Sequence, residues 1–154
     1  MKAIIIVHSY HHNNTEKVAT AIAAPLNAEI KYPQDVSAKD LQEYDIIGLG
    51  AGIDSGKHYT PILEFAETLP DMDGKKAFIF STCGIFTKKK MFSDHAAMRN
   101  VLTGKGYVIV DEFSCAGFNT NSFLKIIGGI NKGRPNNEDL QRAKEFAEKL
   151  INTI

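Results

Sequence analysis

The stretch that decides the fold is residues 3–17, which read AIIIVHSYHHNNTEK. Its first part, Ala3–His8, is apolar at consecutive positions, which is typical of a strand covered on both faces. A polar turn follows, and beyond it Val18, Ile22 and Leu26 recur at helical spacing. The stretch therefore predicts a buried strand, a short loop and a helix.

The same alternation of strand and helix signals continues to the end of the chain. Further strands are expected at Ala28–Tyr32, Asp45–Gly50, Ala77–Thr82 and Tyr107–Phe113. Helices are expected over 37–43, over 62–69 after Pro61, over 91–102 with a stop at Gly104, and over 140–150 after the polar run 136–139. Five such units predict an α/β doubly wound fold, in which helices cover both faces of a five-stranded parallel sheet in three layers.

Length, charge and cysteine content narrow the class of protein. The chain has 154 residues, 44% hydrophobic and 23% charged, as a single globular domain spanning 1–154 would have. Eighteen basic and eighteen acidic residues cancel, which disfavours a nucleic-acid partner. No apolar run reaches the roughly 20 residues that a membrane span needs. Two cysteines are too few for a disulfide scaffold, so we expect a cytoplasmic protein with no membrane partner.

The loop after the first strand carries the strongest functional signal. Its seven residues lack aliphatic side chains: Ser9, Tyr10, His11, His12, Asn13, Asn14 and Thr15. In doubly wound folds ligands bind beyond the carboxyl ends of the strands, and a helix start offers free N–H groups to an anion. The loop therefore predicts a phosphate site. Two other interpretations are a well-capped helix, with Asn13 and Glu16 at capping-box spacing, and a metal site of clustered histidines, which we rank lower.

The loop after the third strand holds the richest glycine tract, Gly48 to Gly56. A glycine-rich turn allows a flat ligand to approach the backbone closely. Tyr59 could stack on such a ligand, or be a half-buried aromatic at a helix start. After the fifth strand, Phe118 is a candidate aromatic wall or a buttress of the following loop.

Ser9–Thr15, followed by Glu16-Lys17-Val18-Ala19, resembles the phosphate loop of flavodoxin-like proteins, and the similarity extends over the whole chain. The resemblance implies the strand order 2-1-3-4-5 and FMN as cofactor, with its phosphate at residues 9–15. It also implies that the isoalloxazine ring lies between two loops, lined by Ala51, Gly52, Ile53 and Asp54 on one side and by Thr82, Cys83 and Gly84 on the other.

The leading hypothesis is an FMN-binding electron carrier that serves a redox partner protein, as a monomer or weak homodimer. The alternatives are an FMN-dependent NAD(P)H:quinone or nitro reductase, and a flavin-free binding domain on the same fold. Lys88–Lys90 and the basic stretch 125–134 are candidates for steering an acidic partner. Cys83 and Cys115 end neighbouring predicted strands, so a redox-active pair is conceivable, although two reduced thiols are the simpler interpretation.

Overall fold

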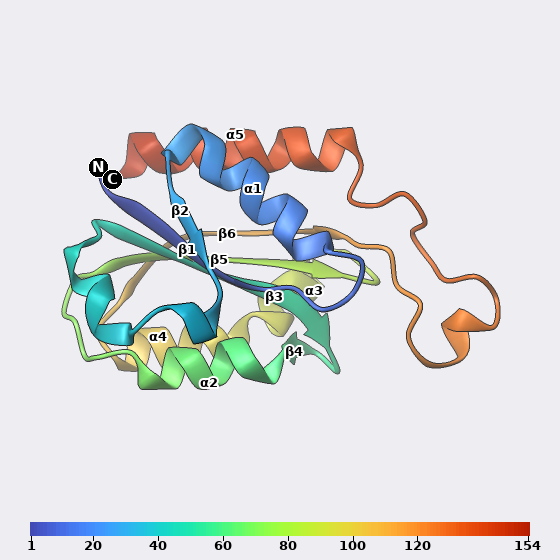
Figure 1. The fold of residues 1–154 in the computed structure, drawn as a ribbon, viewed down its shortest axis with the longest axis horizontal. Coiled ribbons are helices and arrows are strands. Elements are labelled where there is room, and N and C mark those ends of the chain that lie inside the picture. The colour runs from blue at the N-terminus through green and yellow to red at the C-terminus, as the bar shows by residue number, and fades with distance from the viewer.

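The computed structural model describes the backbone of residues 1–154 and every side chain except that of Ser122. Its elements follow one another as β1 (Ala3–His8), α1 (Asn14–Leu26), β2 (Glu29–Lys31), the 3₁₀ helices η1 (Pro33–Asp35) and η2 (Ala38–Glu43), β3 (Ile46–Asp54), β4 (Lys57–His58), α2 (Thr60–Thr68), β5 (Lys76–Cys83), α3 (Lys88–Asp94), α4 (Ala96–Gly104), β6 (Val108–Ala116), the 3₁₀ helix η3 (Ser122–Lys125) and α5 (Asn137–Thr153). Figure 1 shows three layers, with α1 and α5 above the sheet and α2 and α4 below it.

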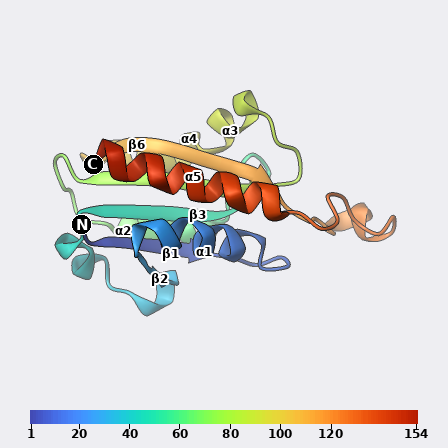
Figure 2. The ribbon, with the colours of Figure 1, turned by 90° about the horizontal axis from the view of Figure 1, so that it is seen from above.

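The sheet confirms the predicted fold class. Its strands lie in the order β2-β1-β3-β5-β6, and each pairs in parallel with its neighbours. Counting these five strands alone gives the expected order 2-1-3-4-5. The sixth strand, β4, was not expected: it folds back on the end of β3 as an antiparallel hairpin. The carboxyl ends of β1, β3, β5 and β6 meet at one edge, from which the segment between β6 and α5 extends away from the body (Figures 1 and 2).

Several predicted boundaries were wrong. β3 continues beyond Gly50 to Asp54, because Ala51 and Gly52 still pair with β5, so residues 51–54 are strand rather than loop. The helix expected over 91–102 is broken at His95 into α3 and α4. The short segment at 37–43 forms a 3₁₀ helix instead of an α-helix. β2 is shorter than predicted, and β6 starts and ends later.

Two apolar clusters fill the space on either side of the sheet. One lies under α1 and α5, and the other under α2 and α4. On the α1 side, the rings of Phe78 and Phe80 cover Gly48 and Gly50, their register partners on β3. No helix in the described part of the chain is long and apolar enough to cross a membrane.

The start of α5 carries the predicted polar cap. The Asn136 side chain accepts a hydrogen bond from the Asp139 backbone N–H at 3.0 Å, and the Asp139 carboxylate accepts one from the Asn136 N–H at 2.9 Å. We expect Asn136→Ala to lower the free energy of unfolding by about 1 kcal/mol, because one helix N–H loses its partner. Urea unfolding of both proteins measures the difference, and equal midpoints at equal slope would contradict the prediction.

Candidate functional site

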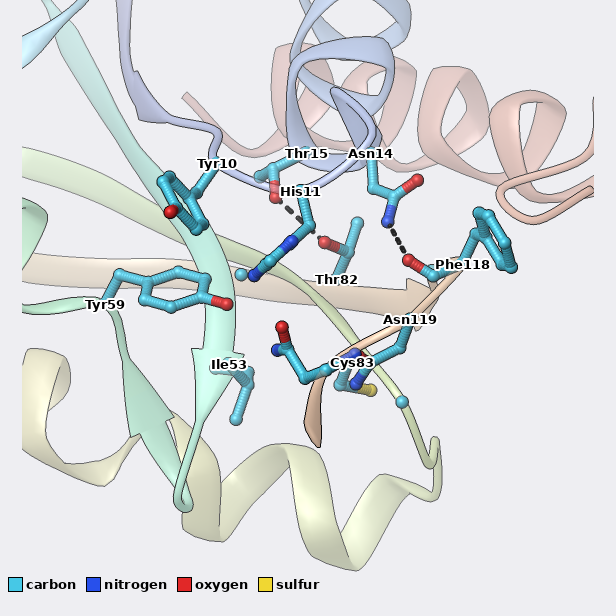
Figure 3. A pocket seen from close by; sticks show the side chains of 14 residues that line it. Tyr10, His11, Asn14, Thr15, Ile53, Tyr59, Thr82, Cys83, Phe118 and Asn119 are labelled. Atoms are coloured by element: carbon cyan, nitrogen blue, oxygen red, sulfur yellow. Dashed lines mark hydrogen bonds between the residues drawn. The ribbon is translucent and has the colours of Figure 1, made fainter. Parts of the chain in front are cut away.

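A cleft opens at the carboxyl ends of β1, β3, β5 and β6 (Figure 3). It encloses about 360 Å³ between protein atoms, part of it open to solvent. The residues that line it are Tyr10, His11, Asn14, Thr15, Gly52, Ile53, Tyr59, Thr82, Cys83, Gly84, Gly117, Phe118, Asn119 and Asn121. Four separate segments of the chain therefore meet at one place, where doubly wound folds bind their ligands.

The loop between β1 and α1 turns sharply into the helix. His12 and Asn13 both have a φ of 53°, in the left-handed region that Asn tolerates better than most residues. The predicted capping box is wrong, because the Asn13 side chain makes no capping hydrogen bond in this conformation. Instead, the Ser9 hydroxyl accepts a hydrogen bond from the Glu16 N–H, at 3.4 Å. The helix start thus faces the cleft without a capping side chain from Asn13.

Two buried side chains at the start of α1 tie the helix to the neighbouring strand ends. The hydroxyls of Thr15 and Thr82 lie 2.8 Å apart, and the Asn14 side-chain N–H donates to the Phe118 carbonyl at 2.8 Å. The other end of the Asn14 amide, Oδ1, is buried in the cleft wall without a hydrogen-bond partner. A buried acceptor of this kind favours a ligand or water that donates a hydrogen bond.

Three glycines expose backbone to the cleft at the ends of adjacent strands. A Cβ on Gly117 would lie 2.8 Å from Asn14 Nδ2, and one on Gly84 would lie 3.2 Å from Asn119 Nδ2. A Cβ on Gly52 would lie 2.6 Å from the ring of Tyr59. Any side chain at these positions would therefore occupy space that belongs to the cleft or its wall.

Aromatic rings border the mouth of the cleft. Tyr59 lies 6.2 Å from Tyr10 and 6.4 Å from His11, centroid to centroid, and Tyr10 is 71% exposed. On the other side, the rings of His12 and Phe118 lie 4.4 Å apart, and His12 Nε2 lies 3.0 Å from the Thr120 hydroxyl. The rings offer flat surfaces on two sides of the glycine-lined floor.

The structure brings eleven of the sixteen predicted site residues together in the cleft lining. They are Tyr10, His11, Asn14, Thr15, Gly52, Ile53, Tyr59, Thr82, Cys83, Gly84 and Phe118. The remaining five lie outside it: Ser9, His12, Asn13, Ala51 and Asp54. Ala51 packs in the core cluster on the α2 side, whereas Asp54 is exposed at the hairpin turn.

Sequence reasoning missed three residues of the lining, Gly117, Asn119 and Asn121. A further residue, Asn131, supports this wall from behind, because its side-chain N–H donates to the carbonyls of Gly84 and Gly117 at 2.6 and 3.3 Å. The signal that could have found them is the density of glycine and asparagine directly after a strand, which is typical of ligand-binding turns.

The two cysteines lie on opposite faces of the sheet. In the register between β5 and β6, Thr82 pairs with Cys115, while Cys83 pairs with Ala116. Neighbouring residues on a strand point to opposite faces, so the two thiols are not placed to form a disulfide. Burial raises the pKa of Cys83, and it raises that of Cys115 to about 12. Cys83 alone reaches the cleft.

The predicted metal interpretation of His8, His11 and His12 gains no support. Among the side chains that the structure describes, no group of three His, Cys, Asp or Glu residues is arranged to hold a metal ion. Burial lowers the pKa of His8.

The fold and the cleft together define a doubly wound protein with a candidate ligand site at the strand ends, and comparisons with known proteins identify its family. Residues 5–149 match the model of the flavodoxin domain, so the chain belongs to the flavodoxin domain family. A relative that is named only as an uncharacterized protein of Methanocaldococcus jannaschii is 45% identical over 151 residues, which cover 98% of this chain and 99% of the relative.

Solved flavodoxins share the fold at low sequence identity. A flavodoxin of Streptococcus pneumoniae TIGR4 superposes with a TM-score of 0.74 at 20% identity, over the full length of both chains. Oxidised flavodoxin 1 of Bacillus cereus gives a TM-score of 0.72 at 21% identity, covering 100% of this chain and 99% of that one. A flavodoxin from the domain Archaea gives 0.69 at 18% identity, over 99% and 97% of the two chains.

Proposed function

We propose that this protein binds FMN in the cleft and transfers electrons between redox partners. The observation that carries the proposal is the cradle of Gly52, Gly84 and Gly117 at the ends of three strands, which faces the start of α1. A flat ring needs close approach to the backbone, and a phosphate needs N–H donors with a favourable dipole. The glycine cradle allows the close approach, and the start of α1 borders the same cleft through Asn14 and Thr15.

The residues at the site fit the parts of FMN. Ser9–Thr15 would hold the phosphate at the start of α1, with the imidazoles of His11 and His12 as additional donors. The unpartnered Oδ1 of Asn14 would accept a hydrogen bond from a ribityl hydroxyl. The ring would lie between Gly52, Ile53 and Tyr59 on one side and residues 82–84 with Phe118 on the other. FMN, when bound, takes up and releases the electrons, and the protein binds and orients it.

Titration of FMN with the purified protein tests the proposal directly. We expect quenching of flavin fluorescence at one equivalent, and binding at least tenfold weaker for riboflavin, which lacks the phosphate. Failure of FMN to bind would overturn the electron-transfer proposal and leave a flavin-free binding domain, the alternative predicted from the sequence.

Gly117→Ala is expected to weaken FMN binding at least tenfold. The new methyl group would meet Asn14 Nδ2 at 2.8 Å and Thr82 Cβ at 3.2 Å, so the wall of the cleft must shift. The matched control is Gly104→Ala at the end of α4, where an added Cβ has no described atom within 4 Å. Fluorescence titration compares the two variants, and equal affinities would contradict the role of the glycine cradle.

A reductase with its own small-molecule substrate is the second candidate, and anaerobic mixing with NADPH separates the two. A carrier loaded with FMN is expected to stay oxidised, whereas the flavin absorbance of a reductase would bleach.

The exposed side chains of four lysines support an acidic redox partner. They are residues 88, 89, 125 and 132, which lie on α3 and on the segment after β6, at the cleft end of the sheet. The proposal takes the chain as a single domain in the cytoplasm, as a monomer or weak homodimer.

A further inference from the structure

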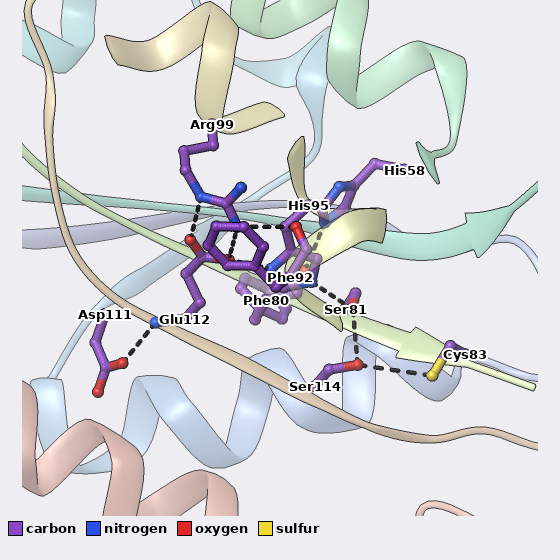
Figure 4. A network of polar contacts seen from close by, with 10 residues as sticks. All are labelled: His58, Phe80, Ser81, Cys83, Phe92, His95, Arg99, Asp111, Glu112 and Ser114. Atoms are coloured by element: carbon purple, nitrogen blue, oxygen red, sulfur yellow. Dashed lines mark hydrogen bonds and ion pairs between the residues drawn. The ribbon is translucent and has the colours of Figure 1, made fainter. Parts of the chain in front are cut away.

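A buried chain of polar side chains runs from the cleft to the outer side of β6 (Figure 4). It starts at the thiol of Cys83, which lies 3.7 Å from the Ser114 hydroxyl. The hydroxyls of Ser114 and Ser81 are 2.8 Å apart, and that of Ser81 is 2.7 Å from His95 Nε2. The chain ends where His95 Nδ1 meets the carboxylate of Glu112, at 2.7 Å.

Hydrogen-bond accounting gives the chain a direction. Ser81 donates its proton to Ser114, so it must accept from His95 Nε2. On the other side of the ring, Nδ1 faces a carboxylate and therefore also donates. A polar chain that runs in this direction requires both ring nitrogens of His95 to donate, with the carboxylate of Glu112 facing Nδ1. Ser114 is then free to donate to the sulfur of Cys83, whose own S–H donates to the Ile85 carbonyl at 3.3 Å.

The surroundings hold this charge arrangement in place. Arg99 binds both oxygens of Glu112, at 2.7 and 2.8 Å. Burial alone would raise the pKa of Glu112, but the hydrogen bonds from His95 and Arg99 lower it to about 2. The ring of His58 lies 4.8 Å from that of His95 and is buried. Burial, together with the charge of His95, lowers the pKa of His58 to about 3, so His58 stays neutral.

The end of the polar chain at β6 opens to a surface groove. The groove follows β6 between α3 and α5, encloses about 670 Å³ and is lined by Glu112 and Ser114 among others. The opposite end of the polar chain, Cys83, lies in the wall of the cleft. The two openings are therefore joined by side chains that can each give and take a proton.

We propose that Cys83, Ser114, Ser81 and His95 form a proton relay that supplies protons to a ligand reduced in the cleft. The inference rests on the proposed function for the identity of that ligand, a flavin. After the redox partner has delivered the electrons, Cys83 gives its proton to the flavin, Ser114 gives one to Cys83, Ser81 to Ser114, and His95 to Ser81. One proton moves and no electrons move in this step, which leaves His95 neutral.

The relay is recharged from the groove. A solvent acid gives one proton to the Ser114 oxygen, the Ser114 proton passes to Ser81, and the Ser81 proton returns to His95 Nε2. Glu112 stays ionised throughout and holds the Nδ1 proton in place. Ser114 is thus the branch point, where the path from the groove joins the path to the cleft.

The first test needs no flavin. Nitrogen-15 NMR of the histidine rings at pH 7 is expected to show that both ring nitrogens of His95 carry protons. A spectrum in which Nε2 is unprotonated would overturn the relay, because the chain would then have no proton to release toward Cys83. This measurement stays decisive even if FMN fails to bind, so it separates failure of the relay from failure of the proposed function.

The second test measures proton uptake after rapid photoreduction of the FMN-loaded protein, followed with a pH-indicator dye. Ser114→Ala is expected to slow uptake on the order of 10²-fold, the size of a lost general acid. Ser114→Thr keeps a hydroxyl and should restore the rate to within a few-fold. The control is Tyr107→Phe, which removes the buried hydrogen bond to Pro70 at the opposite end of β6. Unchanged uptake in Ser114→Ala, with FMN affinity intact, would overturn the proposal.

Discussion

Acidification from pH 6.5 to 4.5 is expected to lower the free energy of unfolding by about 2 kcal/mol through His58 alone. This side chain is 1% exposed, and its Nε2 lies 3.2 Å from the Phe80 carbonyl. Its Nδ1 is buried without a hydrogen-bond partner, so protonation there would place an uncompensated charge beside His95. The folded protein therefore resists a proton that the unfolded chain accepts readily.

The sign follows from the two pKa values of His58. Burial, and the nearby charge of His95, lower the pKa of His58 in the folded state to about 3, against an ordinary value of 6.5. Between these values the unfolded state binds more protons than the folded state, so stability falls as the pH falls. The contribution of His58 to the free energy of unfolding is therefore present above pH 6.5 and is lost progressively toward pH 3. Each pH unit within the window costs up to about 1.4 kcal/mol.

Urea unfolding at several pH values measures this effect, with His58→Gln as the test variant. Glutamine does not titrate, yet its side-chain N–H can still donate to the Phe80 carbonyl. We expect the variant to lose the slope of stability between pH 6.5 and 4.5. A slope equal to that of the original protein would show that another group carries the acid sensitivity.

Glu112 provides a matched comparison in a lower pH window. The pKa of its carboxyl is lowered to about 2, against an ordinary value of 4.5, so its contribution to stability is present above pH 4.5 and is lost toward pH 2. In Glu112→Gln the loss of stability between pH 4.5 and 2 should therefore be smaller than in the original protein. At pH 7 Glu112→Gln is expected to lower the free energy of unfolding by roughly 3–5 kcal/mol, because His95 and Arg99 lose the carboxylate that both contact.

The layered fold could be predicted because its signals are local. The apolar runs at 3–7 and 77–80 have no polar position to turn toward solvent, and both lie in central parallel strands. The break at His95 gave no such signal, since Met91, Met98 and Leu102 keep helical spacing across it. His95 leaves the helical pattern because its ring bonds to Ser81 and Glu112, on two strands distant in the sequence.

The candidate site was predicted in part for a related reason. Glycine and small polar residues after each strand identify the edge where a ligand would lie, and that rule found most of the cleft. It failed for Ala51, because β3 continues past Gly50 and carries Ala51 into the core. It also missed Asn119 and Asn121, whose places depend on how the segment after β6 folds back through the bridge between Asn119 and Ile130.

A methyl group in the centre of the sheet is expected to destabilise the core. In Gly48→Ala the new Cβ would lie 2.2 Å from Cζ of Phe78, whose ring is fully buried under α1 and α5. The ring of Phe78 has no space to move into, because the ring of Phe146 packs against it, with the two centroids 5.8 Å apart. Since overpacking a core costs roughly 1–3 kcal/mol and occasionally more, we expect a loss of about 3 kcal/mol.

Removing the obstructing ring should recover part of that loss. In the double variant Gly48→Ala/Phe78→Leu, the shorter side chain leaves room for the new methyl group, so we expect it to be at least 1 kcal/mol more stable than the sum of the two single changes predicts. Chemical unfolding of all four proteins gives this coupling energy, and Gly104→Ala, with no described atom within 4 Å of the added Cβ, controls for the loss of a glycine. Strict additivity would mean that the two residues do not compete for the same space. We expect residues 48 and 78 to depend on each other only through their cross-strand contact. Without coupling, the pairing of a glycine on β3 with an aromatic ring on β5 would need another explanation.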